Sequence, residues 1–385
     1  MGAQQQVPGP GSNVARRRKE RGLSQVALAR RAGVSVSLLS KIEVGDRALT
    51  QGVAAALARA LELTLDALLG SAPEKNLNEL NYAIRRFDLP GEPPKHPELL
   101  QQHVDALNTL RWNTEMFQLL QRLPAVLADV TSHAHLTGTP RAWGLVADVY
   151  SIVYWLAARH RWMHLAELAT MKQRLAAERA DPVAAVVAAR DDAGTFLNSG
   201  DFAGGLAVVD RALVQAESTL SGRERAFGLG ILHLRGLTLA GRLKDKQATN
   251  NHIEAAWRAS AEFGAETAEH GIHFGPENTA THVISTASDL EQHRTALDTA
   301  EELLRSGLSL PATRVSPLHM NVARSQLALG ERENTLESLE KAWAVAPEMM
   351  AVHPTSLELT RVLISQHKRS NERLTQIAHR LGVVV

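Results

Sequence analysis

The sequence predicts an all-α protein with a five-helix N-terminal domain followed by a longer array of helical repeats. Three observations favour this fold class. Apolar residues recur at helical spacing along most of the chain, β-branched runs are rare after Pro97, and turn residues recur roughly every 40 residues. Because 385 residues are too many for one ordinary core, at least two domains are expected.

Changes in composition predict four segments. Residues 1–12 are rich in Gln, Gly and Pro without an apolar period, which indicates a flexible tail. Short helical segments fill residues 13–72, and we expect them to form one small domain. Residues 73–98 are a Pro-containing linker with one docking helix, expected around Leu77–Phe87. Residues 99–385 contain long helices and form the predicted repeat domain.

Charge separates the small domain from the rest of the chain. The net charge of the whole chain is +1. Through Gly70 there are ten Lys and Arg residues against five acidic residues, which gives +5 and leaves −4 on the remaining 315 residues. A basic head on a mildly acidic body favours binding of a polyanion by the head.

Within the head, residues 24–43 indicate two helices joined by a short turn. Ser24 can cap the first helix, Leu28 and Ala29 face inward, Gly33 supplies the turn, and Ser35 can cap the second helix. Such a unit places its second helix in the major groove of DNA. Residues 13–70 resemble the phage-repressor and xenobiotic-response-element family of helix-turn-helix domains. The matching positions are Ser24, Gln25, Leu28, Ala29, Gly33, Val34, Ser35, Leu39, Ser40, Ile42, Glu43 and Gly45.

The second helix of this unit is the predicted recognition helix. Its outer face carries Val36, Ser37, Ser40 and Lys41. The resemblance implies base contacts at Val36, Ser37 and Lys41. Lys41 can donate to guanine O6 and N7, whereas Val36 offers only apolar contact, for instance to a thymine methyl group.

Other residues of the head are expected to position the DNA backbone or to stabilise the fold. Gln25 and Ser35 lie at helix N-termini, where backbone N–H groups favour a phosphate. Arg17 and Arg47 are candidate phosphate clamps, and a solvated surface charge is the alternative for each. The resemblance also implies a partly buried ion pair between Arg18 and Glu43.

Helix-breaking positions recur along the rest of the chain, at His160, Gly200, Gly241, Asp289 and Gly330, with spacings of 40, 41, 48 and 41 residues. Gly200 is followed twelve residues later by Ala212, and Gly330 by Ala342, with Pro347 ending that helix. The pattern resembles the tetratricopeptide repeat family, in which the small residue permits close helix crossing. Because these spacings exceed the usual ~34 residues, longer helices and irregular loops are expected. An irregular all-α domain is the alternative.

One predicted helix in the repeats, beginning at Pro276, carries an unusual neutral polar face. Its side chains are Asn278, Thr281, His282 and Ser285, and the next first helix offers Asn321 and Arg324 in a comparable place. First helices line the groove in which repeat arrays bind ligands. We therefore expect a peptide or small-molecule effector to bind there, and the alternative is polar packing between helices.

No catalytic motif, cofactor motif or metal-binding cluster is evident in the sequence. His133 and His135, or His270 and His273, could hold a metal, but such pairs arise by chance among 16 histidines. The absence of Cys excludes disulfides and thiolate metal sites. Neither a signal-peptide pattern nor a long apolar run occurs, so we expect a cytoplasmic protein without membrane contact.

A basic DNA-binding head joined to repeats resembles actinobacterial helix-turn-helix regulators with tetratricopeptide-like C-terminal domains, and the peptide-sensing quorum regulators of other bacteria. The resemblance implies a sequence-specific, double-stranded-DNA-binding transcriptional regulator. An enzyme is a weaker alternative, and the absence of a catalytic cluster argues against it. The resemblance also implies a homodimer on a pseudo-palindromic operator, with an effector bound by the repeats. The alternative is a DNA-associated scaffold whose repeats recruit a protein partner.

Overall fold

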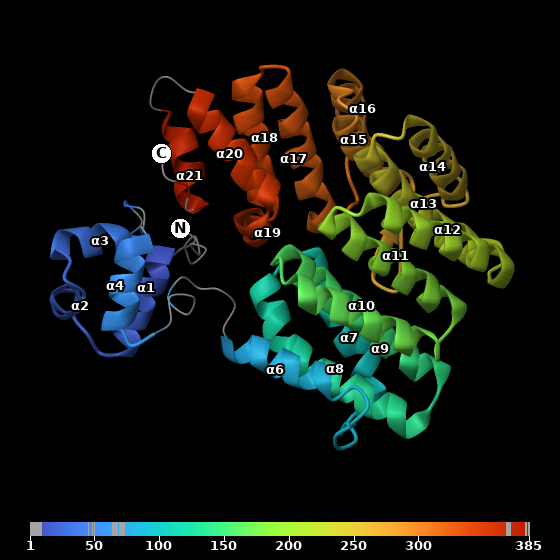
Figure 1. Cartoon of the computed structure of the whole chain (residues 1–385), viewed down its shortest axis with the longest axis horizontal. Helices are drawn as coiled ribbons and strands as arrows, with labels where there is room; N and C mark the ends of the chain where they lie inside the picture. The colour runs from blue at the N-terminus through green and yellow to red at the C-terminus, as the bar shows by residue number, and fades with distance from the viewer. Residues whose placement is uncertain are drawn as a thin grey trace. The chain divides into compact units, whose positions relative to one another are not determined.

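The computed structural model describes residues 10–44, 46–47, 49, 51–63, 68, 74–366, 371–381 and 383. Figure 1 draws these residues as coloured ribbons. Their contacts divide them into two compact units. The first unit combines residues up to 79 with residues from 350 onward, and the second runs from 80 to 349. The prediction of an all-α fold is confirmed, because nearly all regular structure in both units is helical.

Four helices build the N-terminal part of the first unit, and a single apolar core joins them. They are α1 (Pro10–Glu20), α2 (Gln25–Ala32), α3 (Val36–Val44) and α4 (Gln51–Ala60). The core contains Val14 from α1, Leu28 from α2, Leu39 from α3 and Leu57 from α4, each fully buried. Leu68 joins the same core. The expected fifth helix and the expected domain boundary near residue 72 lie outside the described residues.

Helix α1 begins three residues earlier than the sequence indicated. Pro10 opens the helix, as its fixed φ allows. Gly11 lies so close to α3 that a Cβ atom there would come within 1.9 Å of the Ile42 carbonyl oxygen. Residues 10–12 therefore belong to the packed head, and only residues 1–9 of the expected tail lie outside the described part.

In the second unit, helices follow one another as antiparallel pairs. The pairs are α7 (Leu100–Trp112) with α8 (Met116–Thr137), α9 (Pro140–Arg159) with α10 (Met163–Ala177), α11 (Pro182–Ser199) with α12 (Phe202–Thr219), α13 (Gly222–Leu243) with α14 (Lys246–Ser260), α15 (Pro276–Asp289) with α16 (His293–Ser306), and α17 (Ala312–Ala328) with α18 (Arg332–Val345). Helix α6 (Glu74–Arg85) and the 3₁₀ turn η1 (Pro97–Leu99) precede them.

The turns within five of these pairs fall at the predicted positions or within a few residues of them. Gly200 adopts a left-handed conformation with φ of 86° and ends α11, and Gly330 has φ of 80° between α17 and α18. Gly241 and Asp289 remain helical, and the turns begin at Lys244 and Leu290. Ala212 and Ala342 are buried, as close helix crossing requires. The repeat prediction is thus confirmed.

Phe87, just after the end of α6, anchors the linker in the second unit. Its ring lies 5.8 Å from the ring of Tyr150 and 5.9 Å from that of Trp143, and its carbonyl oxygen lies 2.7 Å from Nε2 of His135. The Lys172 ammonium lies 4.6 Å above the Phe87 ring centre. This part of the linker is therefore held by apolar and cation–π contacts.

A short hairpin, which the sequence did not predict, lies between α14 and α15. Strands β1 (Thr267–Glu269) and β2 (Ile272–Phe274) are antiparallel, with Glu269 opposite Ile272. His270 and Gly271 form its two-residue turn, and both have positive φ (48° and 70°), as a type I′ turn requires. Phe274 is fully buried among aromatic rings of the main core.

After α18 the chain continues as α19 (Pro347–Val352), α20 (Pro354–Gln366) and α21 (Glu372–Arg380). Pro347 follows the end of α18, as predicted, and opens α19. Among the described residues, no helix combines the length and apolar character needed to cross a membrane.

Candidate functional site

The outer face of α3 presents the residues predicted to contact DNA bases. Val36, Ser37 and Lys41 are exposed, and Ser40 is half-buried. Leu39 and Ile42, on the opposite side, are buried in the head. The exposed face also extends to Val44, which is 66% exposed and lies one turn beyond Lys41. Sequence reasoning missed Val44, although its i+3 spacing from Lys41 was a usable signal.

Local hydrogen bonds fix the angle between α2 and α3. The Ser24 hydroxyl accepts the Ala27 N–H at 3.1 Å and caps α2. Gly33 ends α2 in the left-handed region with φ of 67°, which costs glycine nothing. The Ser35 hydroxyl accepts the Leu38 N–H at 3.1 Å and caps α3. The short turn and both predicted caps are therefore present, and they set the direction in which α3 leaves α2.

Arg18 and Glu43 form the ion pair that the resemblance implied. Arg18 donates from Nε to Oε1 of Glu43 at 2.7 Å and from Nη2 to Oε2 at 2.8 Å. Their side chains are only 11% and 5% exposed. Although burial opposes ionisation of Glu43, the hydrogen bonds from Arg18 and Gln25 outweigh it and lower the pKa of Glu43. The pair ties α1 to the recognition helix.

The four residues predicted to contact phosphates differ in their exposure and in their hydrogen-bond partners. Gln25 donates its amide to Oε2 of Glu43 at 2.8 Å, so it supports the ion pair. Arg17 pairs with Glu20 at 3.0 Å and is partly exposed. Arg47 is exposed, and its backbone N–H donates to the Lys41 carbonyl oxygen at 3.1 Å. Ser35 accepts as a cap, but its O–H remains available for a phosphate. Phosphate contact by these four residues stays a prediction.

The neutral polar face of α15 does not form a single surface. Asn278 is 1% exposed and donates to the His273 carbonyl oxygen at 2.7 Å, while its Oδ1 atom has no partner among the described residues. Thr281 donates to the Asn278 carbonyl oxygen at 2.8 Å. Nδ1 of His282 lies 3.5 Å from the Thr238 hydroxyl. Asn278 and His282 line a common small cavity.

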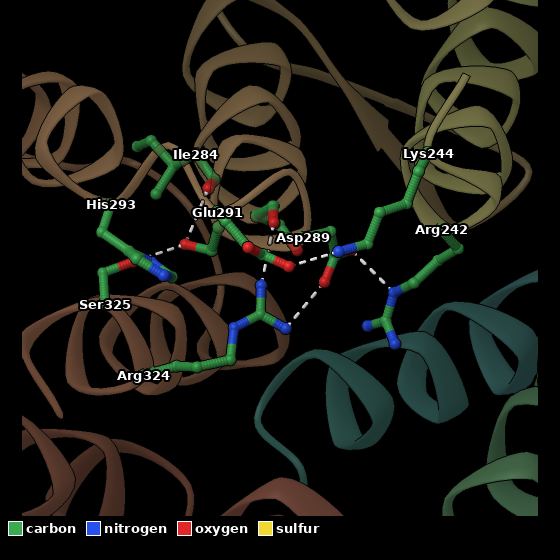
Figure 2. Close-up of polar contacts among 10 residues, drawn as sticks. Arg242, Lys244, Ile284, Asp289, Glu291, His293, Arg324 and Ser325 are labelled. Atoms are coloured by element: carbon green, nitrogen blue, oxygen red, sulfur yellow. Dashed lines mark hydrogen bonds and ion pairs between the residues drawn. The ribbon is translucent and has the colours of Figure 1, made fainter. Parts of the chain in front are cut away.

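Ser285 and Arg324 instead make polar contacts between neighbouring repeats. Figure 2 shows the contact of Arg324 with Asp289. Arg324 donates to the Ser285 carbonyl oxygen at 3.0 Å and pairs with Asp289 at 2.8 Å. Arg242 approaches the other oxygen of Asp289 at 2.7 Å. For these two residues the structure favours the alternative, polar packing between helices. Asn321 lies half-buried on α17.

Sequence reasoning also missed a group of arginines inside the second unit, which we call the arginine cluster. It consists of Arg111 on α7, Arg159 on α9, Arg190 on α11, Arg235 on α13 and Arg314 on α17. Each comes from the first helix of its pair, and all are buried or half-buried. Arg190, Arg235 and Arg314 line the same small cavity as Asn278 and His282.

Negative charge in the cluster is scarce. Asp191 is fully buried and pairs with Arg190 at 2.6 Å, and it also accepts from Ser151 and Gln173. Burial, reinforced by the charges of Arg190 and other arginines, lowers the pKa of Arg314. Burial likewise lowers the pKa of Arg111 to about 10, although the charge of Asp191 opposes this. These guanidinium groups therefore repel one another.

The histidines singled out as metal candidates have other contacts. Nδ1 of His270 lies 2.8 Å from Asp148. The ring of His273 packs edge-on against Trp112 at 4.8 Å. His135 contacts Phe87, and the ring of His133 lines a different pocket. In the part of the chain that the structure describes, no group of three or more His, Asp or Glu is placed to hold a metal ion.

Comparison with known proteins places the head in a family. Residues 14–68 match the family described as helix-turn-helix, so this segment is a helix-turn-helix domain. No curated protein matches the chain. The structure of Bacillus thuringiensis PlcR with the peptide PapR7 and DNA is 13% identical, covers 94% of this chain and 100% of PlcR, and gives a TM-score of 0.29. The structure of the PrgX/cCF10 complex is 10% identical, covers 88% of this chain and 93% of PrgX, and gives a TM-score of 0.24. At these values the solved structures assign neither a ligand nor an assembly to this chain.

Proposed function

We propose that this protein is a transcriptional regulator that binds a specific DNA sequence through α3. The observation that carries the proposal is the exposed face of α3, held by two caps, a glycine turn and the Arg18–Glu43 pair. Lys41 at its centre provides three N–H donors that suit the acceptors of guanine in the major groove. The excess positive charge of the head supports binding of the DNA backbone.

We further propose that the protein binds its operator as a homodimer, with two heads on one DNA molecule. A single head offers one short helix, which is a small surface for specific recognition. A homodimer reads two half-sites about 10 base pairs apart, or a multiple of that, on a pseudo-palindromic operator. The repeat unit then supplies the contact between protomers and the binding site for an effector, a peptide or small molecule.

The test begins with selection of an operator from a random DNA pool by the full chain. On that operator, Lys41→Ala is expected to weaken binding by about 1–3 kcal/mol and to flatten the preference at one base position. Arg30→Ala, which removes an exposed charge from α2, is the matched control and should leave the preference intact. If Lys41→Ala kept both affinity and preference, α3 would not be the reading helix.

Backbone contacts have a different signature. Arg17→Ala and Arg47→Ala should weaken all sequences alike and lower the slope of affinity against salt by about one each. Sedimentation of the protein–operator complex gives the number of chains bound. One chain on a full operator would contradict the homodimer.

A further inference from the structure

The arginine cluster contains more guanidinium groups than there are carboxylates paired with them among the described residues. Of its five guanidinium groups, only Arg190 forms an ion pair with a carboxylate among the described residues. Arg111 and Arg159 lie over the Trp155 ring at 5.9 Å, which contributes far less than a full counter-charge. Glu266 is within electrostatic reach of Arg314, but its Oε1 atom accepts the N–H groups of Glu277 and Asn278.

Such an arrangement of buried charges has a high free-energy cost. Buried charges without partners destabilise a fold strongly, and like charges add to that cost. Nη1 of Arg111 and Nε of Arg159 are buried without a hydrogen-bond partner in the described part of the chain. Guanidinium groups bind carboxylates in a bidentate manner, so the cluster is suited to an oxyanion.

Asn278 narrows the chemistry of that anion. Its Oδ1 atom is a buried acceptor without a donor among the described residues. Asn278 lines the same cavity as Arg190, Arg235 and Arg314. A bare carboxylate cannot donate to it, whereas an amide N–H next to a carboxylate can. The C-terminal end of a peptide, or an acylated amino acid, offers a carboxylate and an N–H on one residue. The cavity has a volume of about 10 Å³, which is room for about one water molecule. Because Arg235 and Arg314 are only half-buried, the end group is held at the edge of this cavity and the rest of the ligand lies outside.

We propose that the arginine cluster and Asn278 bind the terminal carboxylate and adjacent N–H group of the effector. This inference rests on the effector part of the proposed function for its biological role. The binding itself requires only the cavity, the guanidinium groups and the free acceptor of Asn278. His282 and His273 complete the lining as neutral groups, because burial and the neighbouring arginines lower their pKa values.

The test uses the full chain and three probes at equal ionic strength and pH: acetate, N-acetylglycine and inorganic phosphate. Dissociation constants come from tryptophan fluorescence, since Trp155 and Trp112 contact residues of the cluster and the cavity, and from the rise in melting temperature. N-acetylglycine is expected to bind more tightly than acetate. Arg314→Gln is expected to weaken both by roughly tenfold or more, because it removes a charge from the cavity.

Two variants separate the carboxylate from the N–H. Asn278→Ala should remove the advantage of N-acetylglycine over acetate, so that the variant binds the two probes alike. Arg305→Gln, which removes a 71% exposed arginine on α16, is the matched control and should bind all probes as the wild type does. Because Arg314→Gln relieves repulsion among buried charges, it should melt no lower than the wild type in chloride alone.

Several results would overturn the proposal. Equal binding of the probes by wild type and Arg314→Gln would exclude the cluster as the anion site, as would no binding of any probe by the wild type. Phosphate binding that exceeds N-acetylglycine binding, with Asn278→Ala without effect, would exclude the carboxylate and N–H assignment. Operator affinity, measured in the same buffers, reports on the proposed function separately. If the wild type binds N-acetylglycine but its operator affinity is the same with and without this probe, only the effector role is contradicted.

Discussion

Replacement of Arg18 by Met tests how the recognition helix is held. The change removes both hydrogen bonds to the Glu43 carboxylate and the one from Nη1 to the Leu23 carbonyl oxygen at 2.7 Å. Glu43 then keeps one neutral donor, the amide of Gln25. With its side chain only 5% exposed, the carboxylate either stays charged at a large desolvation cost or takes up a proton.

Protonation sets an upper limit on the cost. Starting from the ordinary value of 4.5, neutralising Glu43 at pH 7 requires 2.5 pH units, or about 3.4 kcal/mol at 1.36 kcal/mol per unit. The lost bond to Leu23 adds about 1 kcal/mol. We therefore expect Arg18→Met to destabilise the head by about 3–4 kcal/mol at pH 7. At pH 5 the protonation part falls to about 0.7 kcal/mol, so the loss shrinks to about 1–2 kcal/mol.

The sign follows from the wild-type pair. Because the pKa of Glu43 is lowered in the folded state, its contribution to stability is present above its unfolded pKa, near 4.5. That contribution is lost as the pH falls through the lowered value. The variant loses this contribution equally at pH 5 and pH 7. Its unpaired, buried carboxylate is easier to protonate as the pH falls toward 4.5, and the difference between the two proteins therefore narrows from pH 7 to pH 5.

Hydrogen exchange of the amides in α3, measured in the full chain, gives the opening free energy of the head alone. Arg18→Met with Glu43→Leu should recover most of the loss, since no buried charge remains. Arg16→Met is the control, because its pair with Glu20 is about half exposed and contributes little. A loss that is the same at pH 5 and pH 7 would refute the assignment of the cost to the Glu43 carboxylate.

Two further changes test features that the sequence did not reveal. Gly11→Ala should destabilise the head by about 1–3 kcal/mol in the same exchange measurement, because the added Cβ would overlap the Ile42 carbonyl group and push α1 from α3. Unchanged exchange would place Gly11 outside the packed head. The hydrogen bond and charge of Asp148 outweigh burial and raise the pKa of His270 to about 9, so its contribution is full below pH 6.5 and lost as the pH rises through about 9. That contribution is at most about 3 kcal/mol, less the cost of burying Asp148, and urea unfolding of wild type and His270→Gln between pH 6 and 10 should converge at high pH.

The helix-turn-helix and the repeats were predictable because their signals are local. Ser24, Gly33 and Ser35 have roles that depend on backbone conformation within a few residues, and the structure gives each the predicted role. The repeat turns likewise follow from breaks in helical periodicity. The Arg18–Glu43 pair spans 25 residues, and it came from the family resemblance rather than from spacing.

Features set by tertiary contact were not predictable in the same way. The Pro and Gly of residues 10–12 read as a tail, yet close approach to α3 makes glycine at position 11 necessary. The hairpin was missed because three-residue strands carry almost no periodic signal, and its turn uses a histidine at positive φ. The arginine cluster draws one residue from each of five helices, 31 to 79 positions apart, and only the stacking of the pairs brings them together.

The arginine cluster accounts for the lack of charged residues on the neutral face of α15. Helix α15 is the first helix of its pair, yet it contributes no arginine where α11, α13 and α17 each contribute one. A further positive charge there would raise the repulsion that already lowers the pKa of Arg314. Asn278 and His282 supply hydrogen-bonding atoms to the cavity without adding charge. The absence of charge that marks α15 in the sequence is thus a property of the cavity it lines, and the charge that would attract a ligand is carried by the helices around it.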